Sequence, residues 1–284
     1  MEETPKEWFK TAAEDLEAAR ILYQGQKYQQ AIFYLQQANE KVSKGLLIRI
    51  GFLPEYQETT KVRELRRAVG VYPSTPRIYG HAWHRNLFRV LEGFIGSTDS
   101  LTRSMVRMKL GDKRIVRSIR EFRKSIPDLE SRLNTAKKVK TNPNPSLREI
   151  DGVVRTCNQL LDSSAEAEQK AAEAMKKIKF PDRNLLVASI EKYFGTKLDQ
   201  ETLEKVNKIY GMNPSELVKN VYALAVTLLV LAVLNTYLLP HEHISRYPDS
   251  NMDFAYDREF PLVKRFYEIS DLIMKCLELA TRPD

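Results

Sequence analysis

The sequence predicts an all-α protein organised as an up-and-down helical bundle, and three observations support this fold class. Apolar residues recur at helical spacing over long stretches of the chain. Glycine contributes only 11 of the 284 residues, and charged residues make up 29% of them, which favours long helices with polar faces. Recognisable start and stop signals flank the periodic stretches. A strand-rich fold therefore has little support.

The first fifty residues predict an antiparallel pair of helices. Thr4 and Glu7 form a capping box with a proline at the first helical position, so the first helix should begin near residue 5. Gly25 ends it, and a second helix is expected over residues 28–50. The carboxylates of Glu14 and Asp15 are expected on the helix surface. The apolar stripe of the second helix runs through Ala31, Leu35, Ala38, Val42 and Leu46.

Helical patterns continue along the rest of the chain. The further helices are expected over residues 81–94, 100–140, 147–178, 184–194, 200–210, 213–239 and 260–280. The segment 141–146 contains two prolines and two asparagines, so it should separate the second of these helices from the third.

The most apolar stretch, residues 221–239, allows two interpretations. It is about long enough to span a bilayer, with Tyr222 and Tyr237 as interface anchors. Asn235 and two threonines argue against a membrane span, and a helix that is apolar all round is also what the core of a bundle needs. We expect a buried bundle helix and no membrane partner.

The charge and the cysteine content indicate which partners and which cellular compartment to expect. The chain carries a formal net charge of +8, and residues 97–150 alone contain fourteen basic and six acidic residues, an excess as large as that of the whole chain. Such an excess favours anionic partners. Cys157 and Cys276 match no disulfide or zinc pattern and are expected to be buried free thiols. The polar, acidic N-terminus is unlike a secretion signal, so a cytoplasmic location is expected.

The order and spacing of residues 13–47 resemble the HEPN family. The resemblance rests on the Asp15-Leu16 pair, Gly25, Tyr28 and the run Gln36-Gln37-Ala38-Asn39-Glu40-Lys41. It continues where His81 and His84 precede Leu87, and it returns at Ser245-Arg246-Tyr247-Pro248-Asp249, which is similar to the RYPD segment of the family.

The resemblance implies a domain division. Residues 1–96 together with 215–284 would form a HEPN-like helical bundle, and residues 97–214 would form a basic helical insertion, partly like a coiled coil. It also implies a homodimer, and either nucleotide binding beside a nucleotidyltransferase or ribonuclease activity in toxin–antitoxin and defence systems.

A HEPN ribonuclease would need a histidine to move the 2′-hydroxyl proton and an arginine to stabilise charge on the phosphate. Arg77 and His84 have the spacing of the family's ribonuclease motif, but they precede or open a third helix instead of lying in a later one. Arg246 is the other candidate arginine. We therefore take His84, Arg77 and Arg246 as candidate catalytic residues.

A second cluster follows the apolar helix. His241, His243, Arg246 and Tyr247 could surround a phosphate, with His81 or His84 facing them across a groove. Alternatively, Arg246 pairs locally with Asp249, and the tyrosine and proline between them stabilise the turn.

The basic segment offers a third candidate surface. The residues concerned are Arg103, Arg107, Lys113, Arg117, Arg120 and Lys124. The last four are spaced to share one helix face, which would be either a solvated face or a surface that follows phosphates.

Three functions remain open at this stage. The chain could be an RNA- or nucleotide-binding HEPN protein, a metal-independent ribonuclease with a partner antitoxin, or a scaffold that binds another protein through its basic face. No Walker loop, Rossmann fingerprint, HExxH or GxSxG motif is present, so we expect neither a metal nor a cofactor.

Overall fold

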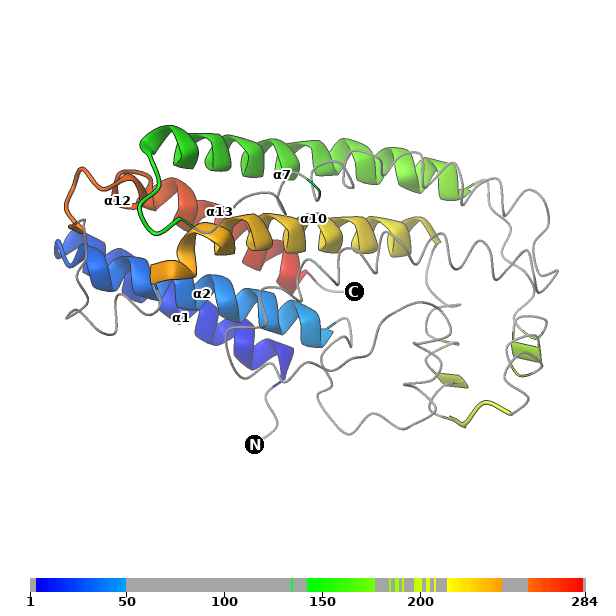
Figure 1. Ribbon diagram of the computed structural model, residues 1–284. Coiled ribbons are helices and arrows are strands. Elements are labelled where there is room, and N and C mark those ends of the chain that lie inside the picture. The colour runs from blue at the N-terminus through cyan, green and yellow to red at the C-terminus, as the bar shows by residue number, and fades with distance from the viewer. Residues whose placement is uncertain are drawn as a thin grey trace.

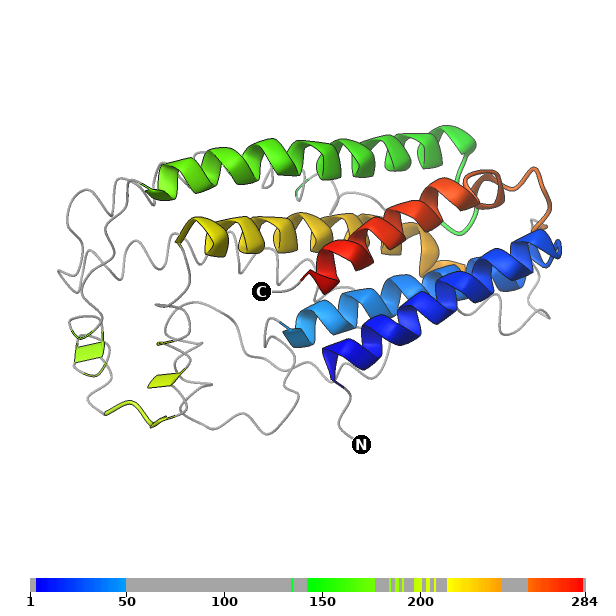
Figure 2. The same ribbon diagram turned by 180° about the vertical axis from the view of Figure 1, so that it is seen from behind.

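The computed structural model describes residues 4–49, 134, 142–176, 184, 187–188, 191, 197–200, 203–204, 207, 214–241 and 255–282. All elements in these residues are helical, and they form an up-and-down bundle (Figures 1 and 2). The helices are α1 (Pro5–Gln24), α2 (Tyr28–Arg49), α7 (Leu147–Lys176), α10 (Pro214–Leu238), α12 (Pro261–Lys264) and α13 (Phe266–Thr281). The all-α fold class is therefore confirmed.

The N-terminal helix pair forms as its sequence predicts. The side chain of Thr4 accepts a hydrogen bond from the backbone N–H of Glu7, and Glu7 accepts one in return from the backbone of Thr4, which completes the capping box of α1. A short turn through Gly25 and Gln26 then reverses the chain, and Gln26 adopts a positive φ of 58°. The two helices pack closely along their length (Figure 1).

Small residues permit this close approach of α1 and α2. Ala12, Ala19, Ala31 and Ala38 are fully buried. A Cβ atom on Gly45 would lie only 2.6 Å from Cε1 of Phe9, so the aromatic ring occupies the space that a side chain would need.

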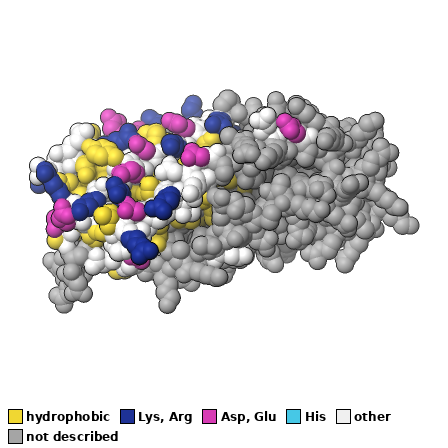
Figure 3. Space-filling model, turned by 90° about the horizontal axis from the view of Figure 1, so that it is seen from above, with side chains coloured by type: hydrophobic (Ala, Val, Ile, Leu, Met, Phe, Trp, Pro, Cys, Tyr) yellow, Lys and Arg dark blue, Asp and Glu magenta, His cyan; other side chains and the backbone are white. Residues whose placement is uncertain are grey.

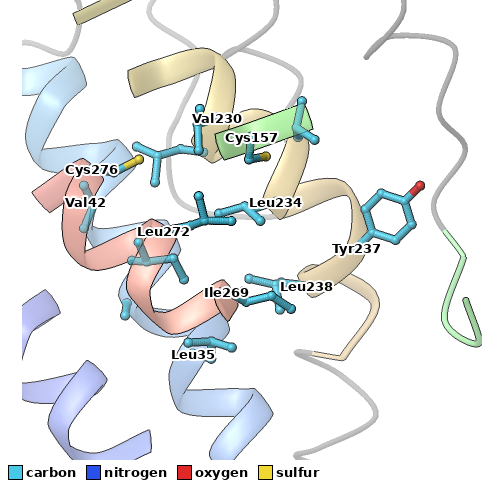
Figure 4. Close-up of a cluster of buried hydrophobic side chains, with 14 of the residues drawn as sticks. Leu35, Val42, Cys157, Val230, Leu234, Tyr237, Leu238, Ile269, Leu272 and Cys276 are labelled. Carbon is cyan, nitrogen blue, oxygen red and sulfur yellow. The ribbon is translucent and has the colours of Figure 1, made fainter. Parts of the chain in front are cut away.

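Helix α10 is the centre of the bundle, where it packs against α2, α7 and α13. All residues from Ala225 to Leu238 are buried, so the helix has no solvated face over these fourteen positions. Figure 4 shows Val230, Leu234 and Leu238 meeting side chains of α2 and α13, among them Val42 and Leu272. The expectation of a buried bundle helix is confirmed for this stretch. Over the residues described, no helix is long and apolar enough to cross a membrane.

Helix α7 lies against α10 and belongs to the same core. Ser146 and Glu149 form its capping box. Its apolar stripe is buried at Ile150, Val153, Cys157 and Leu160. Helix α7 falls within residues 97–214, and the division of the chain into a bundle and an inserted subdomain stays a prediction.

The C-terminal segment differs in one respect from the single helix expected over residues 260–280. Arg265, with φ −106° and ψ 20°, interrupts it and separates α12 from α13. The guanidinium of Arg265 bonds to Asp151 on α7 at 2.6 Å and to Glu268 at 3.1 Å, so this break joins the two helices to α7. At the other end of α13, Arg49 donates to the backbone carbonyls of Ala280 and Arg282, which anchors the end of α13 to α2.

The two cysteines lie in the core, on α7 and α13 (Figure 4). Both are free and buried, as expected. Burial raises the pKa of the Cys157 thiol to about 12 and raises that of Cys276 well above its usual value, so both remain protonated and unreactive at neutral pH.

Candidate functional site

Among the residues proposed from the sequence to bind or cleave RNA, His241 is the one that the structure describes. The others lie outside the described residues: Arg77, His81, His84, Arg103, Arg107, Lys113, Arg117, Arg120, Lys124, His243, Arg246 and Tyr247. Their roles stay predictions. The expected helices over 81–94 and 100–140 also fall outside the described part of the chain, apart from residue 134, which is helical.

His241 is fully buried just beyond α10. Its Nδ1 lies 2.6 Å from the hydroxyl oxygen of Tyr256, and its ring packs edge-to-face against Tyr256 and Phe260, with centroid distances of 5.6 and 5.7 Å. Tyr256 and Phe260 are themselves in edge-to-face contact at 5.1 Å. These three rings join the end of α10 to the segment that leads into α12.

Burial also determines the charge of His241. Desolvation lowers the pKa of the imidazole from 6.5 to about 4, so the ring is neutral at pH 7. A neutral imidazole can form hydrogen bonds but brings no positive charge to a phosphate. In this arrangement His241 holds α10 to the segment around Tyr256, and any cation for an anion site near residues 243–247 would have to come from its neighbours.

Four charged residues and two glutamines of α1 and α2 form a second polar group, which we call the α1–α2 charge network. The charged residues are Asp15 on α1 and Glu40, Lys41 and Lys44 on α2, and the glutamines are Gln36 and Gln37. Lys41 Nζ lies 2.5 Å from Asp15 Oδ2, and Lys44 pairs with Glu40. The side chains of these four ionised residues are only 11–22% exposed. Gln36 donates to Glu40 at 3.2 Å, and Lys44 lies 5.3 Å from the centre of the Trp8 ring.

Burial dominates the electrostatics of Asp15. Its pKa is raised, because desolvation outweighs the hydrogen bond and the positive charge of Lys41, and Glu14 and Glu40 add to the increase. Asp15 was expected on the helix surface, and that expectation was wrong, because the helix turns this carboxylate toward α2. The Asp15–Lys41 ion pair therefore contributes more to the specific alignment of α1 against α2 than to the stability of the protein.

The buried amide of Asn39 makes the corresponding contact between α2 and α10. Its Nδ2 donates to the backbone carbonyl of Leu231 at 3.3 Å and to Oδ1 of Asn235 at 3.5 Å. Asn39 and Asn235 are both almost fully buried. The run Gln36-Gln37-Ala38-Asn39-Glu40-Lys41 thus supplies contacts to two neighbouring helices, which sequence reasoning did not foresee. The four-residue spacing of Glu40 and Lys44 signals only the ion pair within α2.

The bundle as described is electrically balanced. Basic and acidic residues number seven and five in residues 4–49, four and six in 142–176, one and one in 214–241, and five and five in 255–282. These stretches together have no net charge, so residues elsewhere carry the whole excess of +8. On the face seen in Figure 3, basic and acidic side chains are interspersed over the described part.

The helices and their packing define the class of this protein as an all-α, up-and-down helical bundle. The comparisons then identify the N-terminal helices. The family model described as the HEPN domain matches residues 5–78, which confirms the resemblance over residues 13–47, whereas the likeness at residues 81–87 and 245–249 lies outside the match. The match covers α1, α2 and a further stretch outside the described residues. No curated protein and no solved structure matched the chain. The HEPN match points to functions related to RNA or nucleotides, ribonucleases among them.

Proposed function

We propose that this protein binds RNA or a nucleotide, with the HEPN bundle as a neutral support and with positively charged residues outside it as the main contact surface. The charge distribution carries the proposal. The described bundle contains 17 basic and 17 acidic residues, whereas residues 97–150 hold fourteen basic and six acidic residues. A polyanion gains affinity mainly through counterions released at Lys and Arg contacts, so it would bind where this excess lies.

The contact residues that we propose come from two groups. Lys113, Arg117, Arg120 and Lys124 would follow successive phosphates, with Arg103 and Arg107 extending the surface. His81, His84, His241, His243, Arg246 and Tyr247 would form the second group, a cleft around one phosphate or nucleotide. His241 would act there by positioning the adjacent segment, since its ring is neutral.

The test measures binding of labelled single-stranded RNA by the full chain over a range of salt concentrations. We expect affinity to fall steeply as salt rises. Replacing Lys113, Arg117, Arg120 and Lys124 together by Gln should weaken binding and reduce the slope of log affinity against log salt by about 3.

The matched control removes the same charge from the bundle. Lys6, Lys10, Arg155 and Lys275 are all exposed on described helices, and their combined replacement by Gln lowers the net charge equally. This control should change the salt slope far less. Equal losses in the two variants would show that net charge alone matters, and affinity independent of salt would overturn the proposal.

Metal-independent ribonuclease activity is the second candidate, and the HEPN match together with the histidines and arginines of the sequence favours it. His84 would move the proton of the 2′-hydroxyl, and Arg77 or Arg246 would stabilise the phosphate. Cleavage of labelled RNA that persists with a chelator and disappears in His84→Ala would support this activity. Binding without cleavage would leave the first function in place.

The proposal extends to the partners of the protein. A homodimer, or a complex with a nucleotidyltransferase or an antitoxin, would complete the site. The molar mass of the protein in solution, with and without RNA, tests whether it forms a homodimer. A scaffold that binds an acidic protein through its basic face is the alternative. It predicts that RNA neither binds nor is cleaved.

A further inference from the structure

Figures 1 and 2 show α12 near the turn between α1 and α2 at one end of the bundle. Tyrosines from the two sides of this turn and from the start of α13 come together there with Arg258. We call this group the tyrosine patch, and it comprises Tyr23, Tyr28, Tyr267, Lys27 and Arg258. The ring centroid of Tyr23 lies 5.3 Å from that of Tyr28 and 5.0 Å from that of Tyr267, and both pairs are edge-to-face. Three helices thus bring three phenol rings together at one end of the molecule.

The packing holds these rings in place. Tyr23 stacks on the buried ring of Phe266 with a centroid distance of 4.3 Å, and its hydroxyl donates to the backbone carbonyl of Val263 at 3.1 Å. Tyr267 packs against both Tyr23 and Phe266, yet it remains 45% exposed. The ring of Tyr267 is therefore a fixed aromatic surface that faces solvent. When a ligand stacks on this ring, the protein loses little side-chain entropy, because the ring is already held in place.

One cation contacts Tyr28, and a second precedes it in the chain. Nε of Arg258 donates to the hydroxyl of Tyr28 at 2.9 Å, which fixes the guanidinium beside the ring. Lys27 directly precedes Tyr28 and is exposed. Neither cation has an acidic partner among the residues that the structure describes.

Most of the acidic side chains nearby are already engaged. Asp271 pairs with Arg20, Glu259 with Lys264, and Glu268 with Arg265. The carboxylate of Asp257 accepts hydrogen bonds from the backbone N–H groups of Glu259 and Phe260. Lys27 and Arg258 thus supply positive charge that these carboxylates do not cancel.

We propose that the tyrosine patch binds single-stranded RNA, with a base stacked on Tyr267 and phosphates held by Lys27 and Arg258. An exposed aromatic ring, together with cations that have no acidic partner in the described part of the chain, suits a strand whose bases are free to stack. A duplex keeps its bases stacked on one another, and an acidic peptide would use the cations without needing the ring. This inference rests on the proposed RNA binding and adds a contact on the neutral bundle, separate from the basic segment.

Fluorescence anisotropy of the full chain with labelled oligouridine and oligoadenosine of about 12 nucleotides tests the proposal. Tyr267→Ala should weaken binding about tenfold, whereas Tyr267→Phe should bind like the native chain, because the ring alone is needed. Arg258→Gln and Lys27→Gln should each weaken binding several-fold. Ile21→Ala, at a residue 61% exposed on α1, and Lys6→Gln near the opposite end of α1 are the matched controls and should have no effect.

The outcomes separate this inference from the proposed function. If the native chain binds RNA, and the patch variants bind as well as the controls while the quadruple variant of the basic segment does not, the patch proposal is wrong and the proposed function stands. Equal losses for a labelled duplex would also contradict a single-strand site. Failure of the native chain to bind any RNA would overturn both proposals. Circular dichroism of each variant shows whether a loss of affinity reflects unfolding.

Discussion

Helix α2 makes different kinds of contact on its two sides. Toward α10 and α13 it presents mainly apolar side chains, together with the amide of Asn39 and the guanidinium of Arg49, which both donate to backbone carbonyls. Toward α1 its contacts combine small residues at the closest approach with the Asp15–Lys41 ion pair at the edge. Both sides gain stability by removing apolar surface from water, and the α1 side depends in addition on the close fit of small residues and on paired charges.

The largest effect is expected on the α10 side. Leu231 is fully buried at the centre of the bundle, so Leu231→Ala should lower the free energy of unfolding by about 3 kcal/mol through lost burial and a cavity. Chemical denaturation measures this change. Ile21→Ala, at an exposed position of α1, should change stability by less than about 0.5 kcal/mol, and equal effects at both positions would contradict a core centred on α10.

A pH-dependent effect is expected at the end of α10. Because burial lowers the pKa of His241 to about 4, the unfolded chain binds more protons than the folded one between pH 6.5 and 4. This group therefore makes the protein less stable as the pH falls through that window, by about 2 kcal/mol at pH 5.

Thermal unfolding of His241→Gln between pH 7 and pH 5 should show a weaker pH dependence than the native chain. Tyr256→Phe removes the hydroxyl partner but leaves the imidazole buried, so it should keep the native dependence. An unchanged pH profile in His241→Gln would show that another group is responsible.

Two glycine substitutions test the fit of α1 against α2. Gly45→Ala should destabilise the protein by about 1.5 kcal/mol, since the new methyl group would meet the ring of Phe9 at 2.6 Å. Gly152→Ala on α7 is the matched control, because no atom lies within 4 Å of its new Cβ. It should stabilise the protein by about 0.5 kcal/mol through improved helix propensity. A Gly45→Ala variant at least as stable as the native chain would show that α1 and α2 are not so closely packed.

The smallest effect is expected at the edge of the α1 side. Lys41→Met leaves the carboxylate of Asp15 without its cation and should cost about 1 kcal/mol at pH 7. The pKa of Asp15 is already raised by burial, so lowering the pH should protonate it and reduce this cost. The double variant Asp15→Asn/Lys41→Met should be close to native stability, and a loss equal to that of Lys41→Met would rule out an unpaired carboxylate as the cause.

Much of the helical framework could be predicted because its signals are local. The capping boxes at Thr4 and Ser146 mark helix starts through backbone hydrogen bonds that involve only neighbouring residues. The apolar run ending at Leu238 predicts burial on every side, whatever its neighbours are. The break at Arg265 could not be predicted in this way, because its guanidinium bonds to Asp151 on a distant helix.

The candidate site was less predictable than the fold. His241 was expected to contact an anion, and its surroundings of Tyr256 and Phe260 come from a segment fifteen or more residues later. The tyrosine patch had no sequence signal, since Tyr23, Arg258 and Tyr267 are distant in the chain. The residues on which RNA binding or cleavage would depend, such as His84 and Arg246, stay predictions.

The amino-acid sequence alone establishes that the protein is helical, where its described helices begin and end apart from the break at Arg265, which of their faces are apolar and where the excess positive charge lies. These properties depend on residue spacing, capping and composition, which act over one or two helical turns. The contacts between helices decide that Asp15 and Lys41 become a partly buried pair, that His241 is neutral, and that three tyrosines lie together with Arg258 bonded to one of them. Each of these depends on desolvation and on contacts between helices that are far apart in the chain.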